Sequence, residues 1–204
     1  MINKKFAALS ATAVAAALAL TGCSTSSATS PSNTMSGMDH GSGMMSSSAR
    51  AATSDHNAAD TMFAQGMIPH HEQAVEMSET MLKKQDIPTA VTDLATRIKA
   101  AQAPEIETMT GWLKSWNESA TMGAGHSMDG MMGDDDLKKL EAAQGAEAAR
   151  LFLQQMIVHH EGAVMMAKTE TSQGKNAEAI KLSKDIVTAQ ESEIQEMKDL
   201  LATL

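Results

Sequence analysis

Two pairs of adjacent histidines are the residues of this chain best suited to chemistry. They are His70 with His71 and His159 with His160, and each pair has a methionine three residues before and seven residues after its first histidine. Imidazole nitrogens and thioether sulfurs bind copper, Cu(I) above all, whereas carboxylate-rich sites suit iron or manganese. The pairs therefore predict copper as the bound metal, with iron less favoured. The flanking methionines are Met67, Met77, Met156 and Met166.

The histidine pairs belong to a repeat that covers both halves of the chain. Residues 66–77 match residues 155–166 at an offset of 89, and the pattern of residues 98–113 recurs in residues 186–201 at an offset of 88. The hydrophobic periodicity of each half is typical of α-helices, so each half is predicted to be one helical hairpin. Two hairpins make an all-α four-helix bundle. The expected helices cover about residues 57–84, 89–116, 146–172 and 177–201, with a short helix at 137–143 after the acidic residues 134–136.

One histidine of each pair is expected to point into the bundle core. His70 lies in the middle of an apolar stripe on the first helix, and His159 lies in the middle of the matching stripe on the third. The second histidine of each pair lies about 100° further round its helix, at the flank of the stripe.

The second and fourth helices each carry a carboxylate on the stripe that is expected to face inward. Glu105 shares its stripe with Ala101, and Glu193 shares its stripe with Ala189. At about 1.5 Å per residue, both carboxylates lie at nearly the depth of the histidines, as does the glutamine three residues before each. The expected metal ligands are Met67, His70, His71, Met77, Glu105, Met109, Met156, His159, His160, Met166, Glu193 and Met197.

The same residues also fit a bundle without metal. Buried imidazoles and carboxylates need partners, and histidine and glutamate can satisfy one another while methionine fills the core. Metal binding is favoured because both halves repeat the histidine pair and because Met/His-rich segments lie outside the helices. An imidazole binds metal only when deprotonated, so binding is expected to weaken as the pH falls through about 6.5.

The first 22 residues are predicted to be an export signal. Lys4 and Lys5 precede an apolar segment at residues 6–20 that is too short for a permanent membrane span. Leu20, Thr21, Gly22 and Cys23 follow and resemble a bacterial lipobox, whose cysteine is acylated and becomes the new N-terminus. We therefore expect an exported protein that is anchored to the membrane of the cell envelope through Cys23.

Two segments rich in methionine and histidine flank the first hairpin. Residues 23–56 are a Ser/Gly tether within a stretch, residues 21–62, that has no Val, Ile, Leu, Phe or Trp, and residues 118–133 form the linker between the hairpins. The bundle is expected at 57–204, with hairpins at about 57–117 and 134–204. The two segments are expected to act as flexible arms that capture metal.

Composition excludes several classes of protein. The single cysteine excludes a disulfide framework and cysteine-built metal clusters, and the net charge of −9 disfavours nucleic acid as a partner. The sequence shows no Ser, His and Asp pattern typical of a hydrolase triad and no Gly-rich phosphate-binding loop. Enzymatic activity is therefore not the leading expectation. We expect a protein that buffers copper or exchanges it with a partner protein. The alternatives are a metal-dependent oxidase on a ferritin-like bundle and a structural lipoprotein without metal.

The repeated segments carry a likeness to a known family. The paired Met-Ile-x-His-His-Glu-x-Ala-Val segments, the Met131 and Met132 run and residues 151–160 resemble the bacterial "domain of unknown function 305" family over about residues 60–201. This resemblance implies a ferritin-like four-helix bundle that is often exported, with links to copper binding in some members. Members often carry aspartate ten residues before the first histidine. This chain has Asp60 in the first half but Ala149 in the second, so the second site is expected to be weaker or differently supported.

Overall fold

The computed structural model describes residues 55–122 and 128–204. These residues all belong to one compact unit, Ala49–Leu204. The export signal, Cys23, the tether up to residue 54 and residues 123–127 of the linker lie outside the described residues. Their assigned roles therefore stay predictions.

The described part of the chain is all-helical, as predicted. Its helices are α1 (Ala58–Leu82), α2 (Thr89–Trp116), α3 (Asp134–Ala142), α4 (Gly145–Gln173) and α5 (Ala177–Thr203). The four long helices begin and end within two residues of the expected positions. The short helix α3 begins earlier than expected because its three aspartates form the first turn, where negative charge is favourable. Within the described residues, no helix is apolar over a length that could cross a membrane.

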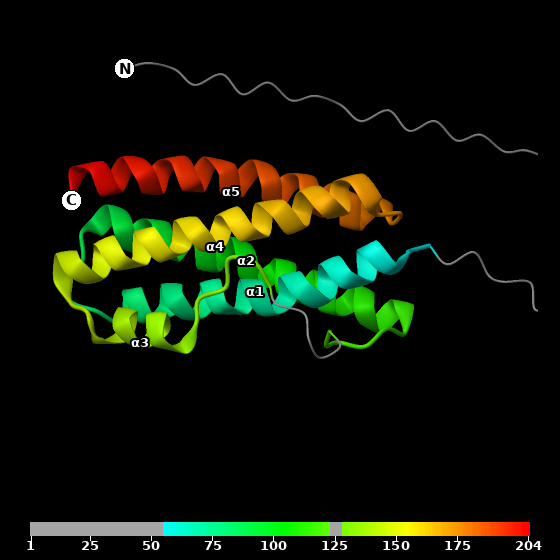
Figure 1. Ribbon diagram of the computed structural model, residues 1–204, viewed down its shortest axis with the longest axis horizontal. Helices are drawn as coiled ribbons and strands as arrows, with labels where there is room; N and C mark the ends of the chain where they lie inside the picture. Colours follow the sequence, from blue (N-terminus) through cyan, green and yellow to red (C-terminus); the bar gives the residue numbers. More distant parts are fainter. Residues whose placement is uncertain (1–54, 123–127) are drawn as a thin grey trace, which may run out of the picture. The chain divides into compact units, whose positions relative to one another are not determined.

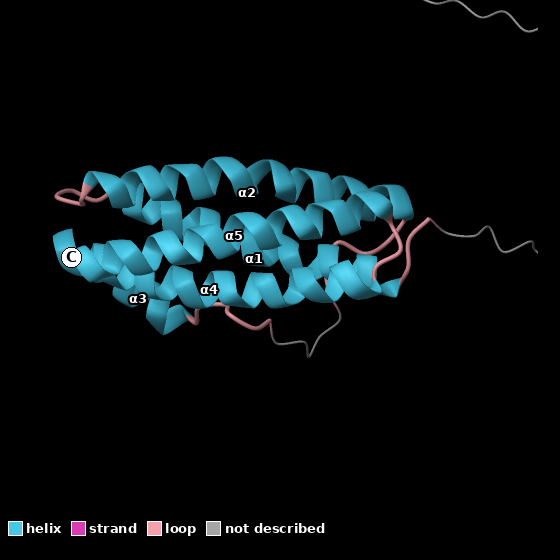
Figure 2. Ribbon diagram, turned by 90° about the horizontal axis from the view of Figure 1, so that it is seen from above, coloured by secondary structure: helices cyan, strands magenta, loops and turns pink. Residues whose placement is uncertain are grey.

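The long helices form two antiparallel hairpins. α1 pairs with α2 and α4 pairs with α5, and the hairpins meet mainly where α1 packs against α4. Figure 1 shows α1 and α4 side by side and running in opposite directions, and Figure 2 shows the four long helices lying lengthwise along one another. α2 and α5 contact each other only slightly, and α3 packs on α1 and α4. The arrangement is the predicted four-helix bundle, with α1 and α4 as its central pair.

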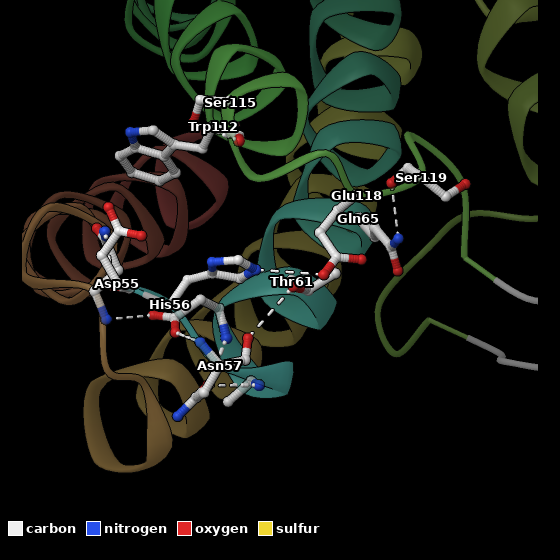
Figure 3. A network of polar contacts seen from close by, with 12 residues as sticks. Asp55, His56, Asn57, Thr61, Gln65, Trp112, Ser115, Glu118 and Ser119 are labelled. Carbon is white, nitrogen blue, oxygen red and sulfur yellow. Dashed lines mark hydrogen bonds and ion pairs between the residues drawn. The ribbon is translucent and has the colours of Figure 1, made fainter. Parts of the chain in front are cut away.

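The start of α1 is attached to the end of α2 (Figure 3). The Asn57 side chain accepts hydrogen bonds from the first turn of α1, and Asp60 accepts one from the Asn57 backbone N–H in return. The His56 ring stacks on Trp116 with centroids 4.5 Å apart, and His56 Nε2 lies 3.3 Å from a carboxylate oxygen of Glu118. The ring stacking and the contact with Glu118 attach His56 to the end of α2.

A polar layer divides the bundle core into two apolar clusters. Along α1, His70 lies between Met67 of one cluster and Ala74 of the other. Along α4, His159 lies between Met156 and Ala163, and the two clusters come in the opposite order because α1 and α4 are antiparallel. We call this level the histidine layer; it also contains the residues of α2 and α5 at the same depth. The cluster toward the α1–α2 turn includes Met77, Met81, Leu94, Ile98, Phe152 and Leu153. The cluster toward the α4–α5 turn includes Phe63, Met67, Met109, Leu113 and Ile186.

On α2 and α5 the buried face differs from the predicted one by one residue. Ala101 and Ala189 are exposed, whereas the adjacent Gln102 and Gln190 are buried. The predicted stripes were wrong here because α2 and α5 each pack mainly against one partner helix, which moves the centre of the buried face toward that partner. As a result, two side-chain amides enter the histidine layer.

Candidate metal centre

The histidine layer brings both histidine pairs together at the contact between the hairpins. The rings of His70 on α1 and His159 on α4 have centroids only 3.8 Å apart, with planes tilted by 41°. The His160 ring lies 6.3 Å from that of His159, and all four histidines are at most 1% exposed. The sequence suggested one site in each hairpin, but the structure joins the two pairs into one cluster.

The second histidine of each pair is held by a carboxylate. His71 Nε2 lies 2.7 Å from Glu105 Oε2, and His160 Nε2 lies 2.8 Å from Glu193 Oε2. A carboxylate accepts hydrogen bonds, so Nε2 carries a proton and donates it, and in a neutral ring the lone pair is then on Nδ1. The flanking position expected for these two histidines was wrong, because both are fully buried. α1 and α4 each pack against two long helices, so their buried faces are wider than one stripe.

Buried ring nitrogens without a hydrogen-bond partner gather in the histidine layer of the described structure. They are Nδ1 of His70, His71 and His160 and both ring nitrogens of His159. The side-chain amide of Gln102 and the side-chain oxygen of Gln190 are also unpaired. Leaving one such atom buried and unpaired costs about 1–3 kcal/mol. A neutral imidazole has one nitrogen lone pair, so unpaired lone pairs of several rings gather in one place, which fits a bound cation.

Burial also keeps two of these rings uncharged. Desolvation, followed by repulsion from His71, lowers the pKa of His70 to about 3. Desolvation, followed by repulsion from His70, lowers the pKa of His159 to about 2. A neutral imidazole binds metal without first losing a proton. The loss of binding expected near pH 6.5 therefore moves to much lower pH for these two residues.

The end of the linker lies over the layer and contacts both central helices. The backbone oxygen of Asp129 lies 3.3 Å from His70 Nε2, and the Gln73 side chain makes two hydrogen bonds with the Met132 backbone, at 2.7 and 2.9 Å. Gly162 occupies the position in the second repeat that Gln73 occupies in the first, and a side chain there would collide with Asp129. Sequence reasoning missed these contacts. In the sequence, the feature that could have indicated them is the difference between Gln73 and Gly162 at matching positions of two otherwise similar segments.

The predicted methionine ligands lie at different distances from the layer. Met67 and Met156 are fully buried, about one helical turn before the first histidine of their pairs. Met77 packs in an apolar cluster about 10 Å along α1 from His70. Met166 is half-buried and faces α1 near Gly66. Two further predicted ligands are fully buried one turn after the layer's glutamates; these are Met109 and Met197.

The available donors favour a soft metal ion. In the described residues, no group of three or more His, Cys, Asp or Glu is arranged to hold a metal ion, and Glu105 and Glu193 already bind histidines. Structural zinc takes four nitrogen or sulfur ligands, and di-iron bundles use carboxylates from all four helices. Imidazole combined with thioether suits copper. The arrangement therefore fits a soft ion better than zinc or iron.

Asp60, which the family resemblance linked to the first site, has another role. Its carboxylate accepts backbone N–H groups of Asn57, Lys175 and Asn176, which attaches the start of α1 to the α4–α5 turn. Burial opposes ionisation of Asp60, but hydrogen bonds, first from Asn176 and then from Asn57, lower its pKa overall. Burial and then the Asp60 carboxylate raise the pKa of Glu170 to about 8. Asp60 therefore holds one end of the bundle together rather than supporting the histidine layer.

Known proteins are similar to this chain in sequence and in fold. The family described as Domain of unknown function (DUF305) matches residues 60–201. A candidate secreted DUF305 protein from Streptomyces coelicolor is 38% identical, with a TM-score of 0.68 over 71% of this chain and 91% of that chain. A DUF305 fragment from Deinococcus radiodurans is 29% identical, with a TM-score of 0.66 over 72% of this chain and 98% of the fragment.

A third relative has been solved with metal. CopM in its Cu(I)-bound form is 33% identical, with a TM-score of 0.60 over 71% of this chain and 96% of CopM. CopM structures with Cu(II) and with silver are similar to this chain as well. A comparison with curated proteins gives no match. The matched residues 60–201 include both histidine pairs and nearly all of the five helices, so this chain belongs to the DUF305 family.

Proposed function

We propose that this chain is an extracytoplasmic copper-binding protein that buffers copper or passes it on, and that it holds Cu(I) in the histidine layer. The observation that carries this proposal is the cluster of buried, unpaired ring nitrogens, two of whose rings stay neutral. The Cu(I), Cu(II) and silver complexes of the related CopM support it.

In this proposal the ligands are ring nitrogens and thioethers. One imidazole ligand is Nδ1 of His71 or of His160, since the Nε2 atoms of these two rings are engaged by glutamates. A ring nitrogen of His70 or His159 is the second imidazole ligand. Buried thioethers complete the set, namely Met67 and Met156, with Met109 and Met197 as further candidates one turn from the layer's glutamates. Glu105 and Glu193 act by fixing the tautomer and orientation of their histidines, a role that carboxylates commonly have at metal sites.

The location outside the cytoplasm rests on the predicted export signal, and the candidate secreted relative supports export. Acylation of Cys23 would hold the protein at the membrane, and the tether would let the bundle reach a partner that donates or receives copper. The Met/His-rich arms would capture ions and raise their concentration near the bundle.

Binding fits the site better than catalysis does. An oxidase needs an open coordination position that oxygen or substrate can reach, whereas the four histidines are at most 1% exposed and the linker contacts His70. The oxidase alternative predicts that metal-loaded protein consumes oxygen over repeated turnovers. The buffering proposal predicts stoichiometric binding without sustained oxygen consumption.

Competition with a Cu(I) chelator tests the proposal. We expect His70→Ala combined with His159→Ala to remove tight Cu(I) binding, leaving only the weaker Met-rich arms. His56→Ala is the matched control, because His56 lies outside the histidine layer and its loss should leave tight binding intact. Circular dichroism must show native helix content in each variant. Unchanged tight stoichiometry in the double variant would place the metal outside the layer.

A further inference from the structure

Three methionine side chains that are not fully buried lie beside a cavity that the histidine layer does not use. The cavity has a volume of about 170 Å³ and lies between the start of α1 and the end of α4. Met62 and Phe63 line it from α1, and Met166 and Glu170 line it from α4. The cavity thus opens at the end of the bundle where α1 begins.

A third methionine approaches the same place from the linker. Gly66 has no side chain, and a Cβ atom built there would lie 3.5 Å from Met166 Sδ and 3.9 Å from Met122 Sδ. The two sulfur atoms therefore border the same point on the surface of α1. Met62 lies one turn earlier on this helix and shares the cavity with Met166.

Packing accounts for these three side chains only in part, because Met166 packs against the apolar cluster toward the α4–α5 turn, whereas Met62 and Met122 belong to neither apolar cluster. The core methionines, such as Met67 and Met109, are fully buried, whereas Met62 is 54% exposed and Met122 and Met166 are half-buried. Exposed apolar side chains gain little hydrophobic stabilisation from their position. What the three share is a polarisable sulfur atom on a side chain that is not fully buried.

The surroundings select for a soft ion of low charge. Thioethers bind Cu(I) and similar soft cations and discriminate against hard divalent ions. Glu170 is the one acidic residue lining the cavity, and burial raises its pKa to about 8, so at neutral pH it offers no anionic ligand. Phe63 supplies an apolar wall.

We infer that Met62, Met122 and Met166 form a second metal site, at the surface of the bundle, that takes a soft monovalent cation such as Cu(I) or Ag(I). Gly66 is four residues from His70, so this thioether site lies about 6 Å along α1 from the histidine layer. The buried Met67 lies between them in the sequence. The site is placed to receive an ion before it enters the layer; only this loading role rests on the proposed function.

Titration of the full-length protein with Ag(I) tests the site, followed by NMR of methionine methyl groups labelled with carbon-13. We expect the signals of Met62, Met122 and Met166 to shift together, while that of Met165 stays in place. Met165 is the matched control because it is 53% exposed and adjacent to Met166 but does not line the cavity. If the signals of Met62, Met122 and Met166 shift at different Ag(I) concentrations, or if the Met165 signal shifts equally, the inference is overturned.

Substitution by leucine gives the second measurement, since leucine nearly preserves the volume of methionine and the fold should survive. In a His70→Ala, His159→Ala background, Met62→Leu with Met122→Leu and Met166→Leu should weaken the Ag(I) affinity of this site by tenfold or more, and Met165→Leu should not. An unchanged affinity would refute the thioether site. Because the histidine background removes the buried site, the result does not depend on whether the histidine layer binds metal.

Discussion

Replacing Gly162 by alanine should displace the linker from the histidine layer. The added Cβ atom would lie 2.1 Å from the backbone oxygen of Asp129 and 2.8 Å from Cα of Gly130. Both neighbours are backbone atoms, so a side-chain rotation cannot relieve the collision and the linker must retreat by about 1 Å or more to restore ordinary contact distances. The contact between Asp129 and His70 is already 3.3 Å long and would break.

The size of the effect follows from two opposing contributions. Alanine is favoured over glycine inside a helix by about 0.5–1 kcal/mol, and overpacking costs about 1–3 kcal/mol. Gly111→Ala is the matched control, because Gly111 is exposed on α2 and a Cβ there meets nothing within 4 Å. The Gly111→Ala variant should therefore be more stable than the wild type. The free energy of unfolding of Gly162→Ala should be lower than that of Gly111→Ala by about 1–3 kcal/mol.

Urea unfolding measures the difference in the free energy of unfolding, and hydrogen exchange reports on the linker. We expect residues 128–132 to lose exchange protection in Gly162→Ala while the long helices keep theirs. If both alanine variants gain stability equally and protection of the linker is unchanged, the linker does not rest on α4 as described.

Three further predictions concern pH and the anchor. The pKa of Glu170 is raised to about 8 from an ordinary value of 4.5, so the folded state holds a proton that the unfolded state loses between these values. The free energy of unfolding should fall by an amount on the order of a few kcal/mol as the pH rises from about 5 to 8. The Glu170→Gln variant should show a flatter dependence on pH. An equally steep dependence in this variant would refute the role of Glu170. Because the pKa values of His70 and His159 are lowered to about 3 and 2, Cu(I) binding measured by chelator competition should persist at pH 5, and a tenfold loss per unit below pH 6.5 would contradict this. Cys23→Ala should move the protein from the membrane to the soluble fraction on cell fractionation; a variant that stays in the membrane fraction would argue against lipid anchoring.

The helices were predictable because local signals and the internal repeat agree. Two copies of one pattern fixed the hairpins, and caps such as Asn57 and Asn176 mark helix starts. The inward position of His70 and His159 followed from apolar periodicity alone. The family match and the related structures confirm the recognition of DUF305 and the helical bundle.

The width of each buried face was not predictable from one helix at a time. His71 was expected at the edge of the core, but it is buried because α1 contacts both α2 and α4. On α2, Gln102 is buried and Ala101 is exposed for the opposite reason, since α2 packs mainly against one helix, α1. Packing against several neighbours is a property of the whole bundle, which periodicity in a single segment does not contain.

The position of the linker end escaped prediction because its composition indicates flexibility. Glycine and serine favour mobile segments, yet Gln73 fixes the Met132 backbone and Gly162 makes room for Asp129. Such contacts depend on which side chain stands at one position of a distant helix. The same composition also concealed that Met122 lies beside Gly66.

Anomalous diffraction from crystals of the protein loaded with Ag(I) or Cu(I) shows directly whether the histidine layer holds the metal. We expect a strong anomalous peak inside the histidine layer, within bonding distance of Nδ1 of His71 or His160 and of a ring nitrogen of His70 or His159. Metal peaks confined to the linker and the bundle surface, with the four rings unchanged and the layer without metal, would contradict this expectation.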